Sequence, residues 1–482
     1  MLANGEVENG FRPRIVVNML DGQRPLIDFT KTEDPDDVDL RPEGGQGVVD
    51  PRHHKLGRFL TLAKFASSLS GERLSTLGDG CRAFAIERNA ALPDGGLDAS
   101  LVQALGEHAA LVCLYRRLMV EHERVSGGRI APDHVHSAAS YGRAALEAAQ
   151  IEPPLARNPD FPRQALAIGM EALYGGEALV GVRTPYLPLP CLFLDVTSVY
   201  PVVASLAGVD HLLKADRLEV HEEDPSEVSA WLASLTADDL LDPRLHAELA
   251  FRFLELVPDG RHVFPHRLPA AKHWKTQVGE LVAHEPLVFT AADARRASLE
   301  TGPLPPILRA IRIAAHGRQR GLKAVTLPSG RTVLPSEDLL FALAEERLAP
   351  AAWPGAKAAA NACSSGIFAQ LNDGERRARV RQRVWRADGR THTEYGLDVE
   401  EPGRWYSPPF AATVMGGGRL LQYLSCALLE RVGGTIAYRD TDAPAVVATR
   451  EGGLVPCEGG PEVDEYGRAC VLALSFAEVE SA

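Results

Sequence analysis

Residues 435–447 read TIAYRDTDAPAVV, in which two apolar runs flank a short polar segment. This pattern is typical of two buried strands joined by a tight turn. Asp440 and Asp442 lie two residues apart, and in extended chain that spacing puts both carboxylates on one face, with about 7 Å of backbone between them. Two such carboxylates repel unless a positive charge bridges them, and a divalent cation does so well. The alternative is an ordinary polar hairpin turn, where Asp is common.

A third carboxylate follows another apolar segment. Residues 192–201 read LFLDVTSVYP, which predicts a strand ending at Asp195 and a helix over residues 199–206. Three acids at the ends of buried strands would hold two Mg²⁺ ions, or Mn²⁺ in their place, for an in-line displacement at a phosphoryl group. Magnesium suits this arrangement because it binds carboxylate oxygens together with substrate phosphate.

Three segments resemble motifs of the family B DNA polymerases, of the bacterial, phage or mobile-element type. Residues 195–201, DVTSVYP, are similar to the first palm motif, which is an Asp, two further residues and then Ser-Leu-Tyr-Pro. Residues 438–443, YRDTDA, are similar to the third motif, Asp-Thr-Asp-Ser. Between them, residues 357–369, KAAANACSSGIFA, are similar to the fingers-helix motif: a Lys, an Asn four residues later, and then Tyr-Gly. The three occur in the order that the family has.

The resemblance implies an α+β fold, with a polymerase palm built on an antiparallel sheet, helical fingers and a preceding partial exonuclease-like domain. It implies that Asp195, Asp440 and Asp442 are the catalytic and metal-binding residues. Lys357 and Asn361 lie four apart and so share one helical face, which suits a nucleotide clamp, although a lone lysine is more often simply solvated. The full set expected to bind the nucleotide is Ser198, Val199, Tyr200, Lys357, Asn361 and Arg347.

The sequence also departs from the family pattern. The fingers-motif Gly lies one residue further from the Asn than usual, and Ser365 stands where a Tyr is usual. The aromatic floor for the nascent base pair is therefore missing, and stacking of that kind is worth about 1–3 kcal/mol per base in single-strand binders. Ala443 replaces a Ser. Glu177 replaces an Arg that often follows the paired glycines described next, and this change is expected to weaken phosphate contact.

Two further segments are predicted to contact DNA. Tyr174, Gly175 and Gly176 resemble the Tyr-x-Gly-Gly element that touches the template strand, and paired glycines let a backbone approach a phosphate. A plain turn is the alternative. In residues 377–384, arginines alternate with other residues, which predicts one strand face carrying the four arginines. That face either contacts DNA phosphates or is simply solvated; the arginines are Arg377, Arg379, Arg381 and Arg383.

The expected organisation, from the N-terminus onward, is loops over residues 1–50, several helices, and then the polymerase elements. The helix expected over residues 336–348 has Ser336 as its N-cap, and the helix expected over residues 410–431 is broken or bent at Gly416–Gly418. The predicted regions are a partial exonuclease-like region without activity (1–125), a connector with the first part of the palm (126–206), an insertion (207–335), the fingers helices (336–372) and the rest of the palm (373–482), with no thumb.

Composition limits the function classes. The 482-residue chain carries a formal net charge of −13, which argues against a protein that simply coats nucleic acid, although a polymerase needs only a local basic groove. Seven cysteines without a Cys-x-x-Cys pair predict reduced thiols in a cytoplasmic protein. No apolar run is long enough to span a membrane, and no signal pattern opens the chain.

Together these features predict a template-directed DNA polymerase whose partners are primer–template DNA and deoxynucleoside triphosphates. The alternative is a catalytically inactive polymerase remnant or a DNA-binding accessory protein. A phosphodiester hydrolase using the same ions is less favoured, because the Lys357 motif has no purpose there. The sequence leaves open the type of primer and whether a separate chain supplies the thumb or the priming function.

Overall fold

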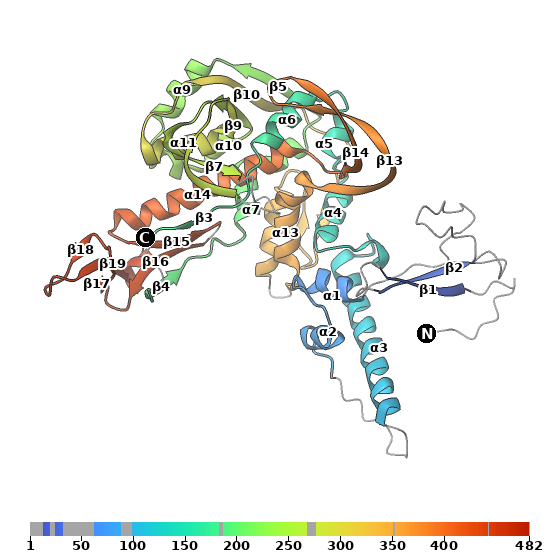
Figure 1. Cartoon of the computed structure of the whole chain (residues 1–482). Coiled ribbons are helices and arrows are strands. Elements are labelled where there is room, and N and C mark those ends of the chain that lie inside the picture. Colours follow the sequence, from blue (N-terminus) through green and yellow to red (C-terminus); the bar gives the residue numbers. More distant parts are fainter. Residues whose placement is uncertain are drawn as a thin grey trace.

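The computed structural model describes residues 13–19, 25–31, 62–87, 99–182, 187–267, 276–349, 352–441 and 443–481. For residues 13–19, 25–31, 99–101, 373–380 and 396–399 it describes the backbone alone. Helices and sheets are mixed along the chain, and every strand pair except β16–β19 is antiparallel, so the fold class is α+β, as the sequence predicted (Figure 1).

Three helices form a unit near the N-terminus: α1 (Leu62–Ser70), α2 (Leu77–Ala83) and α3 (Ala99–Ser126). α2 begins where a capping box predicts it, because Thr76 Oγ1 accepts from the Asp79 backbone N–H at 3.1 Å and the Asp79 carboxylate accepts from that of Thr76 at 2.9 Å. Phe65 and Leu118 belong to the core of this unit. Earlier in the chain, β1 (Pro13–Met19) and β2 (Pro25–Lys31) form an antiparallel pair, so the prediction of loops throughout residues 1–50 was wrong.

A seven-stranded sheet carries the C-terminal part of the chain and two strands from its middle. Its main path is β17-β19-β16-β15-β3; β4 also pairs with β16, and β18 with β19. The helix α14 (Pro408–Arg431) packs against β15 and β16, and α15 (Phe476–Ser481) follows the last strand. The strands are β3 (Ala178–Val180), β4 (Cys191–Phe193), β15 (Ile436–Asp440), β16 (Ala443–Thr449), β17 (Gly453–Pro456), β18 (Glu462–Val463) and β19 (Ala469–Ser475).

A second, four-stranded sheet lies within residues 207–335 and has the order β5-β10-β6-β9. Its strands are β5 (Arg217–Glu223), β6 (Arg252–Leu256), β9 (Leu287–Thr290) and β10 (Ile307–His316). The accompanying helices are α8 (Val209–Leu213), α9 (Pro225–Ser234), α10 (Pro243–Leu249) and α11 (Ala291–Thr301), with a separate hairpin of β7 (Asp259–Arg267) and β8 (Thr276–Val282). Figure 1 shows α14 running between this region and the seven-stranded sheet.

The largest core of the protein joins helices from the middle and the end of the chain. These helices are α4 (Ala139–Ala148), α5 (Pro154–Arg157), α6 (Arg163–Glu171), α7 (Val199–Leu206), α12 (Leu339–Glu345), α13 (Ala356–Ser364) and α14 (Pro408–Arg431). The small hairpin of β11 (Val325–Thr326) and β12 (Thr332–Val333) precedes α12. A long ribbon of β13 (Leu371–Trp385) and β14 (Thr391–Pro402) follows α13 (Figure 1).

Helix α12 corrects one predicted cap. Its N-cap is Asp338, whose carboxylate accepts from the Phe341 backbone N–H at 2.9 Å, and not Ser336. The carboxylate of Asp210 accepts from the Leu339 N–H at 3.1 Å, so two acids satisfy the first turn. The start of this helix therefore depends on a tertiary contact as well as on local sequence.

Helix α14 corrects a second prediction, because it runs through Gly416–Gly418 without a break. A Cβ on Gly416 would collide with the side chain of Thr290, and one on Gly417 would lie 2.6 Å from a methyl carbon of Val203. The first two glycines therefore let α14 approach α11 and α7 closely, which is a packing role and not a hinge role. Gly418 has open space where its Cβ would be.

All seven cysteines lie among the described residues and none forms a disulfide; five are buried, Cys191 is half-buried and Cys113 is exposed. Burial raises the pKa of the Cys363 thiol to about 12. Among the described helices, none combines the length and the apolar composition that crossing a membrane requires.

The glycines of α14 yield a matched pair of substitutions. We expect Gly416→Ala to lower the free energy of unfolding by about 1–3 kcal/mol, because the new methyl group overpacks against Thr290. We expect Gly418→Ala to raise it by about 0.5–1 kcal/mol, because alanine costs less backbone entropy in a helix and meets no neighbour. Urea denaturation of both variants measures the difference, and equal stabilisation by the two would contradict the packing role.

Candidate active site

The structure places Asp195 and Asp440 on opposite sides of β16: Asp440 ends β15, and Asp195 follows β4. Asp440 ends β15 opposite Ala443 of β16, while β4 pairs with the other edge of β16 through Phe193 and Ala445. The Leu194 N–H donates to the Pro444 carbonyl at 3.0 Å, and continuing that register puts Asp195 beside Ala443. The backbones carrying the two acids are thus two strand spacings, about 10 Å, apart. Asp442, the third predicted acid, lies outside the described residues.

Lys357 reaches the same place from α13. Its Nζ lies 3.6 Å from Oδ2 of Asp195, and the two side chains are 46% and 49% exposed. At this exposure the ion pair adds little to stability, because water screens it and both side chains lose rotamer freedom. The Lys357 ammonium is open to solvent and only weakly held by Asp195, so it can leave this carboxylate and bind a phosphate instead.

The N-terminus of α7 lies next to Asp195 in sequence and has an unusual backbone. Its N-cap, Ser198, is buried, and the backbone of this residue is in the left-handed region (φ 56°, ψ 54°). Arg347 Nη1 donates to the Ser198 Oγ at 3.2 Å. Val199 is buried, and Tyr200 is partly buried against the main core. The first amides of a helix have no acceptor within it, so the start of α7 presents backbone N–H groups and the positive end of a helix dipole.

The Asp440 hairpin is held from behind by backbone hydrogen bonds. The N–H of Thr441 donates to the Glu177 carbonyl at 2.6 Å. The buried Gln422 side chain on α14 has one amide atom 3.2 Å from the backbone nitrogens of both Asp440 and Thr441, and we assign that atom as the oxygen because both neighbours are donors. Thr441 also has a positive φ of 43°, so this turn, like the start of α7, stores backbone strain of a kind that clusters at functional sites.

Gly176 explains why paired glycines precede β3. A Cβ at this position would collide with the Thr441 side chain, so only glycine lets the chain pass this close to the hairpin. The Gly175 N–H donates to Thr276 Oγ1 at 2.6 Å. Both contacts are internal to the protein, so the described geometry gives these glycines a packing role that the sequence alone did not predict.

Tyr174 is placed differently from the prediction that its side chain contacts DNA. The ring is buried and stacks on Phe289 with the centroids 5.7 Å apart, and the hydroxyl donates to the Val288 carbonyl at 3.4 Å. Burial raises the pKa of the Tyr174 phenol. The side chain therefore belongs to the core and is not available to a DNA strand.

Two buried ion pairs hold the segment Tyr174–Glu177 against the core. The guanidinium of Arg296 contacts the Glu177 carboxylate with Nη1 at 2.6 Å from Oε2, and both side chains are 1% exposed. Burial raises the pKa of the Glu177 carboxyl, and the positive charge of Arg296 opposes that rise. Glu177, expected from the sequence to weaken phosphate contact, is instead directed inward.

The second pair joins α14 to α11. Arg419 donates to both oxygens of Asp293, from Nε at 2.7 Å and Nη2 at 2.9 Å, and its Nη1 donates to the carbonyls of Tyr174 and Gly175 at 3.0 and 2.6 Å. Bidentate charge-assisted bonds of this kind are among the stronger hydrogen bonds in proteins. They fix the chain that enters β3 against both helices.

The fingers-motif side chains other than Lys357 are less exposed. Among the described residues, Asn361 Oδ1 is a buried oxygen without a hydrogen-bond partner. Ser365 is buried at the end of α13, and its Oγ donates to the Asn361 carbonyl at 3.3 Å. It therefore supplies no surface on which a base could stack.

One face of the β13–β14 ribbon gathers exposed cations and aromatic rings. Arg381 pairs in register with Tyr395 and Arg383 with Thr393, so these residues share a face with Trp385. Arg381 and Arg383 are exposed, and so are Tyr395 and Trp385. Both aromatic residues were missed in the sequence. Trp385 continues the alternation of Arg381 and Arg383 and could have been found from it, whereas Tyr395 joins this face only through the strand register. Arg377 and Arg379 lie where only the backbone is described.

The buried pair on α14 can be compared with an exposed one on the same helix. We expect Arg419→Met to lower the free energy of unfolding by about 3–5 kcal/mol, because it leaves Asp293 buried without a partner. Arg431 forms an exposed pair with Asp238, and Arg431→Met should cost less than about 1 kcal/mol. Urea denaturation followed by circular dichroism measures both, and similar losses in the two variants would refute the structural role of the buried pair.

Comparison with solved structures finds phi29 DNA polymerase in several states. The ternary complex with primer–template DNA and incoming nucleotide substrates is 12% identical, with a TM-score of 0.43, over 85% of this chain and 64% of that chain. The complex with single-stranded DNA is 12% identical, with a TM-score of 0.41, over 83% and 62%. This chain thus spans less than two thirds of the polymerase chain. No protein-family model and no curated protein matches the sequence.

Proposed function

We propose that this chain is a template-directed nucleotidyltransferase that adds deoxynucleotides to the 3′-hydroxyl of a DNA primer. The observation that carries the proposal is the meeting of Asp195, Asp440 and Lys357. These residues come from three distant segments that resemble polymerase motifs. Lys357 Nζ lies 3.6 Å from the Asp195 carboxylate. Asp195 and Asp440 lie on either side of β16, two strand spacings apart.

Asp195 and Asp440 suit the Mg²⁺ ions that such a reaction needs. Both side chains are exposed carboxylates, and hydrated Mg²⁺ prefers one or two carboxylates together with substrate phosphate over an enclosed cage. Asp442 is proposed as the third ligand on its position in the sequence. When bound, the ions would lower the pKa of the primer hydroxyl and offset the charge of the pyrophosphate leaving group.

The nucleotide would lie between α13 and the start of α7. Lys357 supplies an ammonium group for the triphosphate, and the backbone amides of Val199 and Tyr200 at the helix N-terminus supply further donors. Arg347 holds Ser198 in its left-handed conformation through the hydrogen bond to Oγ, which makes it a positioning residue for those amides. Asn361 would support the base pair from the same face of α13 as Lys357.

The DNA would run along the β13–β14 ribbon. Arg381 and Arg383 offer phosphate contacts, and Tyr395 and Trp385 on the same face offer stacking surfaces for unpaired bases. Cations interleaved with exposed rings are typical of surfaces that bind single strands, so the ribbon is proposed to guide the template or the primer strand.

The catalytic role of Asp195 can be tested by primer extension. We expect Asp195→Asn to lower Mg²⁺-dependent incorporation at least about a thousandfold, because the metal contributes several kcal/mol to the barrier. The folded protein should persist, since the side chain is half exposed. Asp238→Asn, which changes an exposed acid in the α9–α10 segment, serves as the control and should retain activity. Wild-type protein that binds primer–template DNA but adds no nucleotide with Mg²⁺ or Mn²⁺ would favour the inactive remnant.

The role of the ribbon can be tested by the salt dependence of DNA binding. Each lost phosphate contact should reduce the slope of log affinity against log salt by about 0.7 on single strands and about 0.9 on duplex. We therefore expect Arg381→Ala/Arg383→Ala to weaken binding and flatten the slope. Arg244→Ala/Arg261→Ala removes the same charge from exposed arginines that already pair with Asp242 and Asp259, and should leave the slope unchanged. Fluorescence anisotropy at several salt concentrations distinguishes the two pairs; equal slopes would exclude the ribbon as the phosphate-binding surface.

A further inference from the structure

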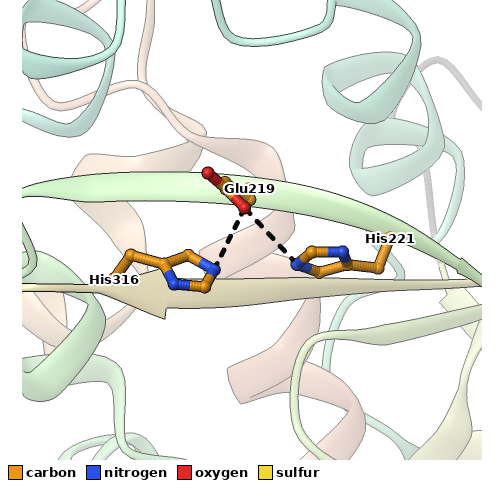
Figure 2. Close-up of side chains that lie close together, drawn as sticks. All are labelled: Glu219, His221 and His316. Carbon is orange, nitrogen blue, oxygen red and sulfur yellow. Dashed lines mark ion pairs between the residues drawn. The ribbon is translucent and has the colours of Figure 1, made fainter.

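Three side chains with metal-binding atoms converge on the four-stranded sheet, away from the residues discussed so far. Glu219 and His221 lie two residues apart on β5 and so share a face, and His316 ends the neighbouring strand β10 (Figure 2). The strand register pairs Ala314 with Glu219 and His316 with Arg217. Because Ala314 carries only a methyl group, both imidazole rings have room to lean toward the carboxylate between them.

The distances between the three ligand atoms are close to those in a tetrahedral metal site. His316 Nε2 lies 3.2 Å from Glu219 Oε2, His221 Nε2 lies 3.8 Å from the same oxygen, and the three ligand atoms all lie within 4.8 Å of one another. Ligands bonded to Zn²⁺ at about 2.0–2.2 Å in a tetrahedral site lie about 3.3 Å apart. A small rotation of the exposed His221 ring would therefore complete the geometry.

The carboxylate is already oriented for this purpose. Arg217 Nε contacts the other oxygen of Glu219, Oε1, at 3.2 Å, which leaves Oε2 directed at the two imidazoles. Partners that hold a ligand from behind in this way typically raise the affinity of a metal site. The side chains of Glu219, His221 and His316 are 32%, 48% and 50% exposed, so an ion can reach them from solvent.

The donor set also selects the class of ion. Two imidazoles and one carboxylate are ligands of zinc sites that keep one position for water, whereas Mg²⁺ and Ca²⁺ prefer oxygen ligands alone. Within the part of the chain that the structure describes, this is the one group of three or more His, Cys, Asp or Glu side chains at ligand distance. The cluster therefore differs in chemistry from the pair Asp195 and Asp440.

We propose that Glu219, His221 and His316 bind a divalent transition-metal ion of the zinc class, with water as the fourth ligand. The ion would connect β5, which is an edge strand of its sheet, to β10 by a link additional to their backbone hydrogen bonds. It would stabilise this part of the chain. The proposal does not depend on nucleotidyl transfer.

The chain offers a matched control for this site. His392 and Glu394 on β14 also lie two residues apart and form an exposed pair, with Nε2 2.9 Å from Oε1, but without a second imidazole. If a single His–Glu pair sufficed, this pair would bind zinc as well. His392→Ala therefore removes a surface histidine without touching the proposed site.

The test is zinc titration of the full chain by calorimetry, after treatment with a chelator and in excess Mg²⁺ so that oxygen-only sites are occupied. Every sample carries Cys113→Ser, since that thiol is exposed and could bind zinc itself. We expect His221→Ala, His316→Ala and Glu219→Gln each to weaken the tightest zinc site at least about tenfold, and His392→Ala to leave it unchanged.

A second readout separates a site that connects the strands from scattered surface binding. Zn²⁺ should raise the melting temperature of the protein but not that of the His316→Ala variant, because a ligand that binds the folded state stabilises it by an amount that grows with the ratio of free ligand to Kd. Circular dichroism without metal verifies that the exposed substitutions leave the fold intact. Zinc affinity that is the same in the wild type and in His316→Ala, or no binding by the wild type, would overturn the proposal.

Discussion

The buried ion pair between Arg419 and Asp293 is the contact on which the candidate active site depends. A charge taken out of water is costly unless its partner and hydrogen bonds are nearly ideal, and here one guanidinium satisfies both carboxylate oxygens and two backbone carbonyls. The carbonyls belong to Tyr174 and Gly175, so the pair ties the chain entering β3 to α11 and α14. Moving that chain would leave Nη1 of the buried guanidinium without its two carbonyl acceptors.

The same contacts also restrain the hairpin that carries Asp440. Glu177, two residues beyond Gly175, pairs with Arg296 through its side chain and accepts from the Thr441 N–H through its carbonyl. Thr441 and Ser198 both have left-handed backbones, a conformation that costs about 1–3 kcal/mol and persists only where the surroundings dictate it. The buried pairs and the close approach of Gly176 provide such surroundings. Their contribution to the stability of the fold offsets the cost of the strained backbone beside Asp440 and Asp195.

Local signals were enough to predict some elements and not others. The apolar run after Ser198 was enough to predict α7 over residues 199–206, where the structure has it. Ser336 and Asp338 are both good caps, and the choice between them depends on Asp210, which only the fold brings near. Likewise, the burial of Tyr174 depends on Phe289, and the cluster of Glu219 with His316 depends on a strand register that spacing in the sequence does not reveal. The meeting of Asp195 with Lys357 was predictable only because their motifs resembled a known order.

The negative charge of the chain does not conflict with a DNA-binding ribbon. At physiological ionic strength exposed charges are screened within about 8 Å, so a phosphate responds to nearby groups and not to the net charge of −13. On the face of β13 and β14 that carries Arg381 and Arg383, the residues opposite are Tyr395 and Thr393, and neither is acidic. Glu394 points to the other face and already pairs with His392. The charge on this face is therefore positive, and a phosphate bound there would interact with this local charge and not with the net charge of the chain.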